Sequence, residues 1–464
     1  MGLTRKQRIT VIVLLTGTVL AILDLSFLSP ALPSIMEDFS IDATTAQWLS
    51  SAYSLVEALI IPLSAYLLGR FSTKRLFVAA MGIFSAGSLL AAWGPNFAVL
   101  LVGRVCQAAC TGILLPMVMT EIVLIFPRER RGTAMGLIGL LVGFAPAIGP
   151  TVSGLLIDSV GWHALFLIVG VLGIIILCVA MVVLETKETA ARTPFDALSV
   201  ALSSIGLLCI LYGLSTFAST SNTTIIIVLI AIGVALIALF VIRQLRLEQP
   251  MLDMRVFRSR RFSSSVAVIA LTQGVYLGIG TVLPLFVQIV RGESAVMSGL
   301  VVLPGALLSA VMALVSGKLY DRFGVHVPAR AGSVCTLAGI ALLATMPMDT
   351  GMPVVAIAYV LCSVGVQLII TPCNTWGINS LSNALVRHAN AAAQTSNQIS
   401  NSFMVALIIS FSALSSVIAP TATELEAAYY GDKIAFIAAA AILLALTAFI
   451  AIFIRDRETD TIVE

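Results

Sequence analysis

Fourteen long apolar runs divide this sequence, and they constrain the fold more than any other feature. Most are long enough for the roughly 20 residues that a helix needs to cross about 30 Å of hydrocarbon. Helices that are apolar on every side share no soluble core, so lipid must be their solvent. The predicted spans lie near residues 9–32, 45–69, 76–95, 97–125, 133–157, 163–184, 197–217, 223–242, 262–290, 294–316, 331–348, 352–375, 399–420 and 434–454.

The distribution of Lys and Arg supports both the number of spans and their orientation. If the N-terminus lies in the cytoplasm and the chain crosses at every run, 23 of the 26 Lys and Arg residues fall on the cytoplasmic side. Arg291 and Lys433 fall outside, and Arg104 lies within a span. One missed or invented helix would reverse the side of every later loop, so the positive-inside rule favours fourteen crossings with both termini in the cytoplasm.

Composition sets the class of protein. The 464 residues are 59% hydrophobic and 11% charged, which excludes a soluble enzyme or a disordered chain. The net charge of +3 reflects the bias of the cytoplasmic loops and predicts no nucleic-acid partner. The first apolar run is longer than a signal-peptide core, so we interpret it as a first membrane helix. We expect a multi-pass, monomeric protein of a bacterial plasma membrane whose main partner is the lipid bilayer.

Cysteine and histidine give no sign of a metal site. All seven cysteines lie in predicted spans, where we expect buried apolar side chains rather than disulfides or metal ligands. The three histidines, His163, His326 and His388, belong to three different loops. We therefore predict no metal and no cofactor.

An internal repeat divides the chain into two halves. The string VSGKLYDRFGVHVPA at 315–329 echoes LSAYLLGRFSTKRLF at 63–77, and each ends the second helix of a six-helix set. This predicts a six-helix half over 1–192, an inserted two-helix hairpin with a cytoplasmic linker over 193–261, and a second six-helix half over 262–464. Repeated halves with a site between them are typical of alternating-access transporters, although a repeat can also be an inert duplication.

Several strings resemble one family almost from end to end. They are LDLSFLSPALPSI at 23–35, GRVCQAACTG at 103–112, GFAPAIGPTVSG at 143–154, WHALFLI at 162–168 and SGLVVLPGAL at 298–307. Together they resemble the fourteen-helix drug–proton antiporter branch of the major facilitator superfamily. The resemblance implies an all-α integral membrane fold of two six-helix halves plus an inserted helix pair, which moves a small-molecule substrate in exchange for protons.

The antiporter motif of the fifth span resembles the family pattern at Gly149, Pro150 and Gly154, with Ser153 in place of one glycine. Small residues let helix backbones approach closely, and Pro150 removes a helical hydrogen bond and allows a kink. The resemblance implies that this helix packs against the tenth span in the other half and seals one side. Helix packing without a gating role is the alternative.

The cytoplasmic loop motif of the family occurs in two copies that differ. The second copy is complete, with Asp321 as its acid, and the resemblance implies a charge contact between Asp321 and a neighbouring helix end. The first copy has Gly69 at the acidic position, so Arg70 needs another partner, such as helix C-terminal carbonyls, or only sets the topology. The matching positions are Gly317, Leu319, Asp321, Arg322 and Gly324 in the second copy, and Ala65, Leu67, Gly69, Arg70 and Ser72 in the first.

Ionisable residues inside spans are functional candidates because burying them is costly. At 1.5 Å per residue, Asp24 and Arg104 lie at roughly the same depth, and Glu57 lies slightly to the cytoplasmic side of the midplane. Asp24 is the predicted proton carrier, with Arg104 beside it, since burial and a nearby cation act in opposite directions on a carboxyl. The alternative is an ion pair that only fixes helix 1 against helix 4. Glu121, near an inner helix end, is a weaker candidate.

Glu57 has no obvious basic neighbour in the sequence. We expect it to attract a cationic substrate or to take a second proton. The alternative is a carboxyl held by a hydroxyl group such as that of Ser26 or Ser54.

Aromatic, Met and Gln side chains near these groups suit a permissive pocket for apolar cations. Ordinary packing or contact with lipid is the alternative for each of them. The predicted cavity residues are Tyr53, Gln107, Met117, Met119, Gln273, Tyr276 and Phe286.

The sequence thus predicts a proton-coupled exporter of amphiphilic or cationic small molecules that works by alternating access. The same machinery moving another solute, such as a lipid, peptide, amino acid or sugar, is the second hypothesis. A membrane-integral enzyme or a sensor is a remote third, since no nucleophile–base pair and no Walker-type string stands out. We predict no catalytic residues.

Overall fold

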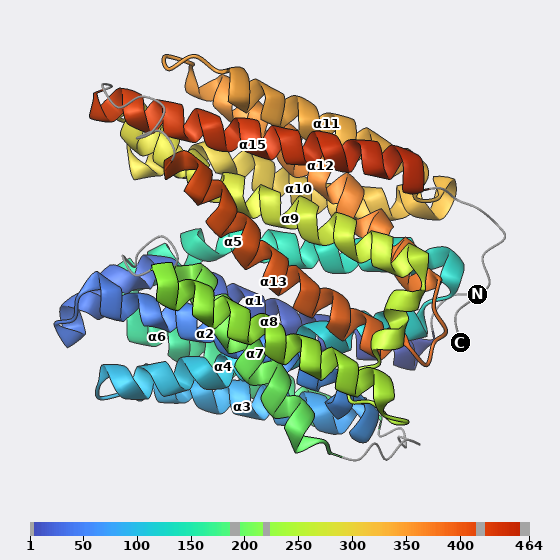
Figure 1. Ribbon diagram of the computed structural model, residues 1–464. Coiled ribbons are helices and arrows are strands. Elements are labelled where there is room, and N and C mark those ends of the chain that lie inside the picture. Colours follow the sequence, from blue (N-terminus) through green and yellow to red (C-terminus); the bar gives the residue numbers. More distant parts are fainter. Residues whose placement is uncertain (1–3, 186–194, 217–222, 414–422, 455–464) are drawn as a thin grey trace.

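The computed structural model describes residues 4–185, 195–216, 223–413 and 423–454. These residues form long α-helices joined by short loops (Figure 1). The long helices are α1 (Arg5–Phe39), α2 (Ala43–Arg70), α3 (Thr73–Trp93), α4 (Phe97–Ile125), α5 (Arg131–Val160), α6 (Trp162–Val183), α7 (Ala197–Thr216), α8 (Thr223–Arg246), α9 (Arg260–Leu285), α10 (Ala295–Phe323), α11 (His326–Thr345), α12 (Met352–Asn379), α13 (Val386–Ala413) and α15 (Glu424–Phe453).

The helices form two lobes. Helices α1 to α6 build the lower lobe of Figure 1 with α7 and α8 against it, and α9 to α12 build the upper lobe with α15. Helices α5 and α13 join the lobes, because α5 packs on both α1 and α10 while α13 packs on both α2 and α9. The architecture is that of an all-helical membrane protein.

Twelve helices of the described residues are long and apolar enough to cross a membrane, and α5 and α13 are not among them. The polar residues of α13 explain its low hydropathy, since Asn, Gln and Ser recur along its first four turns. The twelve agree with the membrane class, whereas fourteen crossings stay a prediction. The proposed domain boundary at 192 and part of the span 399–420 lie outside the described residues.

Local sequence fixes where the helices begin and end. Side chains at the N-cap satisfy free backbone N–H groups, as Thr4 does for α1 and Asn96 does for α4. Gly161 and Gly324 follow helices with φ of 80° and 73°, a left-handed backbone region that glycine enters without strain. The turn after α10 therefore needs Gly324, one of the predicted motif glycines.

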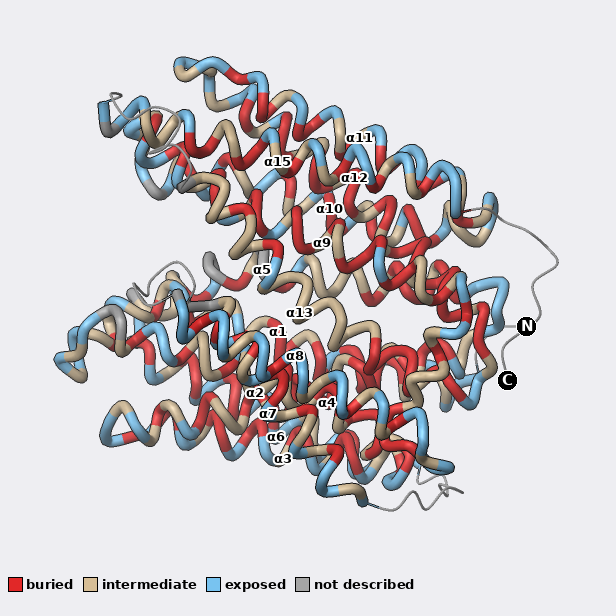
Figure 2. The backbone as a smooth tube through the Cα atoms, in the orientation of Figure 1, coloured by how far each residue is buried: buried red, intermediate tan, exposed pale blue. Residues whose placement is uncertain are grey.

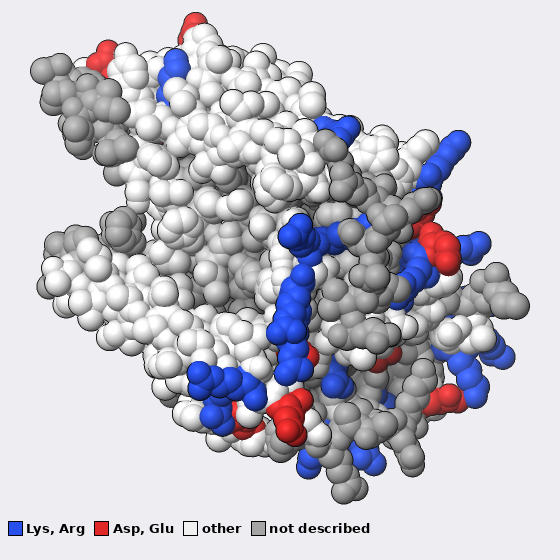
Figure 3. All heavy atoms as spheres, turned by 45° about the vertical axis from the view of Figure 1, so that its right-hand side comes forward, with Lys and Arg blue, Asp and Glu red and all other residues white. Residues whose placement is uncertain are grey.

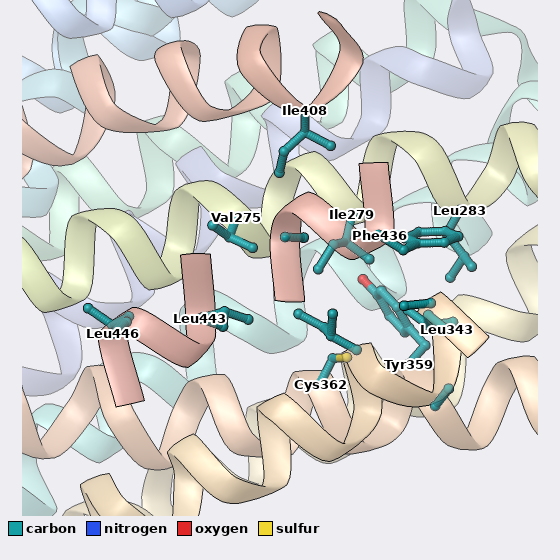
Figure 4. Close-up of a cluster of buried hydrophobic side chains, with 14 of the residues drawn as sticks. Val275, Ile279, Leu283, Leu343, Tyr359, Cys362, Ile408, Phe436, Leu443 and Leu446 are labelled. Carbon is teal, nitrogen blue, oxygen red and sulfur yellow. The ribbon is translucent and has the colours of Figure 1, made fainter. Parts of the chain in front are cut away.

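Each lobe has its own apolar core, and buried residues concentrate where its helices meet (Figure 2). Figure 4 shows the core of the upper lobe, where Phe436 of α15 lies near Ile279 of α9 and Leu343 of α11. The prediction of buried cysteines is confirmed for Cys110, Cys362 and Cys373 and was wrong for Cys178, which is exposed on α6. The other three cysteines are half-buried. A helix face that contacts lipid can expose a small apolar side chain, because the surrounding lipid is itself apolar.

The two ends of the molecule differ. At one end, which we call the basic end, the lobes touch; it carries the charged side chains of Arg70, Arg131, Lys318, Arg322 and Arg387. At the opposite end, which we call the open end, the surface is hollowed between the lobes (Figure 3). The structure is therefore closed at the basic end and open at the other.

Candidate functional site

A buried ion pair lies in the lower lobe. Arg104 Nη1 of α4 donates to Asp24 Oδ2 of α1 at 2.8 Å, and the two side chains are 0% and 1% exposed. Gln107 of α4 completes the site, since its Nε2 donates to Asp24 Oδ1 at 3.0 Å and its Oε1 accepts from Arg104 Nη1 at 2.9 Å. Both oxygens of the Asp24 carboxyl group are thus engaged, as a charge removed from water requires.

Three further side chains extend this network. Gln107 Nε2 also donates to Ser88 Oγ of α3 at 2.9 Å. The guanidinium carbon of Arg104 lies 4.5 Å from the ring centroid of Tyr53 of α2, within the range of a cation–π contact. The hydroxyl groups of Tyr53 and Thr111 are 2.6 Å apart. The predicted cavity residues Tyr53 and Gln107 are therefore fully buried parts of the ion-pair network and do not line the hollow in this conformation.

The spacing of residues on α4 explains the arrangement. Arg104 and Gln107 are three residues apart and share one helix face. Glycines bring α3 close to that face, since a Cβ atom on Gly87 would lie 2.7 Å from the carbonyl oxygen of Gly103. Because the backbones approach so closely, the short hydroxyl side chain of Ser88 reaches Gln107. The R-x-x-Q string thus encodes a network across three helices.

The geometry of the network sets conditions on any proton that Asp24 would bind. A proton on Asp24 Oδ2 would compete directly with the hydrogen bond from Arg104, so binding it requires Arg104 to move or to lose that contact. The unpartnered Arg104 Nε and Nη2 atoms, among the described residues, show that the guanidinium group is not fixed on all sides. Protonation of the Asp24 carboxyl group and the position of Arg104 would therefore depend on each other.

Glu57 lies on α2 four residues beyond Tyr53, so the two side chains share a helix face. It is half-buried, and no hydrogen bond or ion pair of its carboxyl group is found among the described residues. The Ser26 hydroxyl donates to the backbone oxygen of Ile22. The alternative in which Ser26 holds Glu57 is therefore not supported. Glu121, by contrast, accepts a hydrogen bond from the Thr73 hydroxyl on α3.

The upper lobe carries no charge at the position that corresponds to Arg104. A Cβ atom added to Gly87 of α3 would lie 2.7 Å from the carbonyl oxygen of Gly103 in α4. A Cβ atom added to Gly339 of α11 would lie 2.6 Å from the carbonyl oxygen of Ala358 in α12. Gly103 and Ala358 are therefore equivalent positions of the two halves. The next residue is Arg104 in α4 and Tyr359 in α12, so a phenol replaces the guanidinium group.

Tyr359 belongs to a neutral network. Its hydroxyl donates to the Tyr276 hydroxyl at 2.9 Å, and the Tyr276 and Ser363 hydroxyl oxygens are 3.0 Å apart. The rings of Tyr276 and Tyr359 stack with their centroids 5.6 Å apart. Tyr276, a predicted cavity residue, is therefore part of a polar cluster inside the upper lobe, and only the lower lobe carries an intramembrane ion pair among the described residues.

The other predicted cavity residues are divided between cores and partly open positions. Met117 is fully buried in the core of the lower lobe and Phe286 in that of the upper lobe, so for these two the packing alternative is correct. Apolar side chains at helical spacing pack wherever another helix covers them, and the sequence does not show which faces are covered. Gln273 and Met119 are half-buried, and Met119 Sδ accepts from Gln394 Nε2 of α13 at 3.7 Å.

Asp321 joins the lobes at the basic end. Its carboxyl group accepts hydrogen bonds from the backbone N–H groups of Gly132 and Thr133, at 2.8 and 2.7 Å, and from the Thr133 hydroxyl at 2.5 Å. These N–H groups belong to the first turn of α5, where a negative charge is favoured by the helix dipole. The expected contact between Asp321 and a helix end is present. Arg322 is exposed and lies over the ring of Phe323.

Helices α5 and α10 cross most closely at the same end. A Cβ atom on Gly317 would lie 2.1 Å from the carbonyl oxygen of Gly132. The expectation that α5 packs against α10 is confirmed, since Cβ atoms on Gly136 and Gly143 would meet Ala313 and Ala310 of α10. The motif glycines themselves lie beyond this contact: a Cβ atom on Gly149 would meet Ser26 of α1, and one on Gly154 would meet no described atom within 4 Å. The Pro150 side chain lies outside the described residues.

In the first copy of the loop motif, which lacks the acid, the side chain of Arg387 occupies the space beside Gly69. A Cβ atom on Gly69 would lie 2.8 Å from Nη1 of Arg387, the second residue of α13. Arg387 Nε donates to His388 Nε2 at 3.2 Å, and no carboxylate among the described residues pairs with it. Arg70 is exposed. The second copy therefore presents a carboxylate to a helix N-terminus, whereas the first copy presents a glycine to a guanidinium group.

Sequence reasoning missed several polar residues. Ser88, Thr111 and Ser363 carry hydroxyl groups, which are too common in membrane helices to stand out. Asp432 is only 4% exposed. It precedes the predicted last span, which begins at residue 434, but lies inside α15, which begins at Glu424. Among the described residues, no three His, Cys, Asp or Glu side chains lie close enough to hold a metal ion.

Two helical lobes with a hollow between them and a buried ion pair in one of them define a membrane transporter of the alternating-access type. The chain belongs to the Major Facilitator Superfamily, whose family profile matches residues 14–404. It is 38% identical over 446 residues to the MFS-type transporter YcnB of Bacillus subtilis, covering 95% of this chain and 93% of that one.

A drug-resistance protein and a solved structure are also similar. The lincomycin resistance protein LmrB of Listeria monocytogenes is 32% identical over 384 residues, which covers 82% of this chain and 81% of that one. The human organic anion transporter MFSD10 superposes with a TM-score of 0.70 at 14% identity, covering 96% and 100% of the two chains, and so shows the fold alone. The resemblance to drug-efflux members of the superfamily is confirmed.

Proposed function

We propose that this protein exports amphiphilic or cationic small molecules in exchange for protons. The observation that carries the proposal is the fully buried Asp24–Arg104 pair, whose carboxyl group is the only intramembrane acid that pairs with a cation among the described residues. A proton that enters from the open end reaches this carboxyl group, displaces Arg104 and changes how α1 and α4 pack. The resistance function of the LmrB relative supports a toxic solute as cargo.

The two ends of the molecule support a direction. With the basic end in the cytoplasm, as the positive-inside rule favours, the hollow faces the outside and the conformation is outward-open. In this state a solute leaves and a proton enters. The contacts of Asp321 and the crossing of Gly132 and Gly317 then close the cytoplasmic side. The opposite state requires those contacts to break.

The decisive experiment replaces Asp24 with Asn. The amide keeps the shape of the side chain but cannot carry a proton, so we expect pH-driven transport to fall at least tenfold while the protein still folds. The measurement is uptake of a fluorescent cation into inside-out proteoliposomes under an imposed pH gradient. Wild-type rates in the Asn variant would reject the proton-carrier role and leave Asp24 as a packing ion pair.

A further inference from the structure

Four amide side chains lie along one face of α13. They are Asn390, Gln394, Asn397 and Asn401, which we call the amide stripe. Their spacing of four, three and four residues places them one above the other on the helix surface. An amide group is expensive to bury without partners, so four in line inside a membrane protein call for an explanation.

The amide stripe lies where the two lobes meet. Asn390 Nδ2 donates to Thr120 Oγ1 of α4 at 3.0 Å, and Gln394 contacts Met119 of the same helix. The neighbouring face of α13 belongs to the upper lobe, since Ser400 donates to the backbone oxygen of Ala270 in α9. The stripe is therefore the part of the upper lobe that is presented to the lower lobe.

Three of the four amide oxygens of the stripe lack donors. Among the described residues, the Oδ1 atoms of Asn390, Asn397 and Asn401 are buried and have no hydrogen-bond partner, and Asn390 is only 1% exposed. Asn397 Nδ2 donates to Gln394 Oε1 at 3.3 Å, so amide donors are used while these carbonyl oxygens are not. Leucine has a similar volume and would avoid the cost, which indicates that the carbonyl oxygens serve a purpose other than folding.

The stripe extends from the closed end toward the ion-pair network. Helix α4 runs toward the basic end and α13 runs away from it, so the contact between Asn390 and Thr120 sets their register. Asn401 is eleven residues farther along, or about 16 Å at 1.5 Å per residue. Gly112 of α4, which packs against the backbone oxygen of Glu57, lies eight residues or about 12 Å from Thr120. The depth of the unpaired carboxyl group therefore falls between Asn397 and Asn401 of the stripe.

We propose that the amide stripe recognises the N–H groups of protonated amines, and that Glu57 supplies the attraction for their charge. This inference rests on the proposed export function and narrows its substrate class to amines that keep at least one N–H. Unpartnered carbonyl oxygens accept N–H donors, and hydrogen bonds to a charged donor are about twice as strong as neutral ones. A quaternary ammonium ion has the same charge but no N–H, so it gains from Glu57 and not from the stripe.

The test uses one fluorophore with a dimethylammonium headgroup, which has an N–H, and its trimethylammonium analogue, which has none. Binding of each probe is measured by fluorescence anisotropy with the full-length protein in lipid nanodiscs. We expect Asn397→Leu and Asn401→Leu each to weaken the dimethylammonium probe about tenfold and to change the trimethylammonium probe less than twofold. Glu57→Gln should weaken both probes alike. Ser396→Ala is the control, since that hydroxyl is already bonded to Ala392 within α13.

Equal effects of the Asn variants on both probes, or no effect on either, would overturn the inference. Thermal unfolding of each variant shows that it folds, and two separate Leu variants guard against the failure of one. Wild-type proteoliposomes that move neither probe under a pH gradient, while the stripe-dependent difference in binding persists, would reject the export function and keep the stripe. Wild-type protein that binds neither probe would overturn the stripe itself.

Discussion

Arg104 is held by few groups for a buried cation. Asp24 and Gln107 take Nη1, the rings of Tyr53 and Phe166 lie within 4.5 and 5.9 Å of the guanidinium carbon, and Nε and Nη2 have no partner among the described residues. A charge with so few contacts is easily displaced. Incomplete binding of this cation costs stability and favours the displacement of Arg104 that the proposed proton exchange requires.

Replacing Arg104 with Ala should destabilise the protein more than replacing Asp24 with Asn. The Ala variant leaves a buried carboxylate without its cation, which typically costs about 3–5 kcal/mol. The single oxygen of the Asn side chain still accepts from Arg104, and this variant loses only the hydrogen bond from Gln107 Nε2. The measurement is thermal unfolding in detergent at neutral pH. Equal midpoints for both variants would show that Arg104 does not neutralise Asp24 in the folded protein.

At the scale of helices, small residues decide where the lobes can touch. Gly132 and Gly317 let α5 and α10 cross with almost no space between their backbones. A Cβ atom on Gly154, on the same helix, would meet no described atom within 4 Å. Gly317 and Gly154 therefore form a matched pair: alanine would be crowded at position 317 and would have free space at position 154.

Gly317→Ala should impair closure of the basic end, because its Cβ atom would overlap the Gly132 carbonyl oxygen at 2.1 Å. Overpacking of this kind costs about 1–3 kcal/mol, so the variant should lose thermal stability and most of its transport. Gly154→Ala should behave like the wild type, since the new methyl group meets open space and Ala favours the helix. Transport and unfolding are measured on both. Similar losses in the two variants would mean that the crossing has no special role.

The inserted hairpin of α7 and α8 is tied to both lobes. Tyr66 of α2, Met251 and Val256 of the linker and Ala391 of α13 share one apolar cluster. A bidentate pair between Arg243 and Asp196, with N–O distances of 2.9 and 3.1 Å, holds the base of the hairpin. The hairpin and its linker therefore brace the contact between α2 and α13, where the acid of the first loop motif is missing.

Asp196 gives a pH prediction. Hydrogen bonds from Arg243 lower the pKa of Asp196 to about 2, with further help from Ser199 and despite partial burial. Because the pKa is depressed on folding, the stabilisation is complete above the unfolded pKa of about 4 and is lost only as the pH falls toward 2. Asp196→Asn should therefore lower the unfolding temperature by the same amount from pH 5 to pH 8. A difference that changes across this range would assign another titration to the pair.

At the scale of the molecule, the two contacts between the lobes are not equivalent. Asp321 caps α5 on one side, while Arg387 occupies the space beside Gly69 on the other. The contact of Asp321 favours closure electrostatically, because its carboxylate lies at the N-terminus of α5. The other relies on the apolar cluster of the hairpin and linker. Closure is thus asymmetric although both contacts involve copies of one loop motif.

Asp321→Asn should shift the protein toward the state that is open at the basic end. The amide cannot accept the three hydrogen bonds as a charged group does, and those bonds exist only in the closed arrangement. Double electron–electron resonance between spin labels in the loops at 71–74 and 323–327 should show a longer mean distance between the labels in this variant. Gly69→Asp is the opposite test, since its carboxylate would meet Arg387 and favour closure. An unchanged distance distribution in both variants would reject a mechanical role for these loops.

The sequence alone determined the membrane class and the shared depth of Asp24 and Arg104, because helix length, apolarity and loop charge are local properties set against a bilayer of fixed thickness. It could not determine which helix faces are covered. Tertiary structure placed Tyr53 on Arg104, buried Met117 in a core and set Arg387 beside Gly69. These outcomes depend on close packing between residues far apart in the chain, and such packing follows from the three-dimensional fit of whole helices rather than from any local pattern.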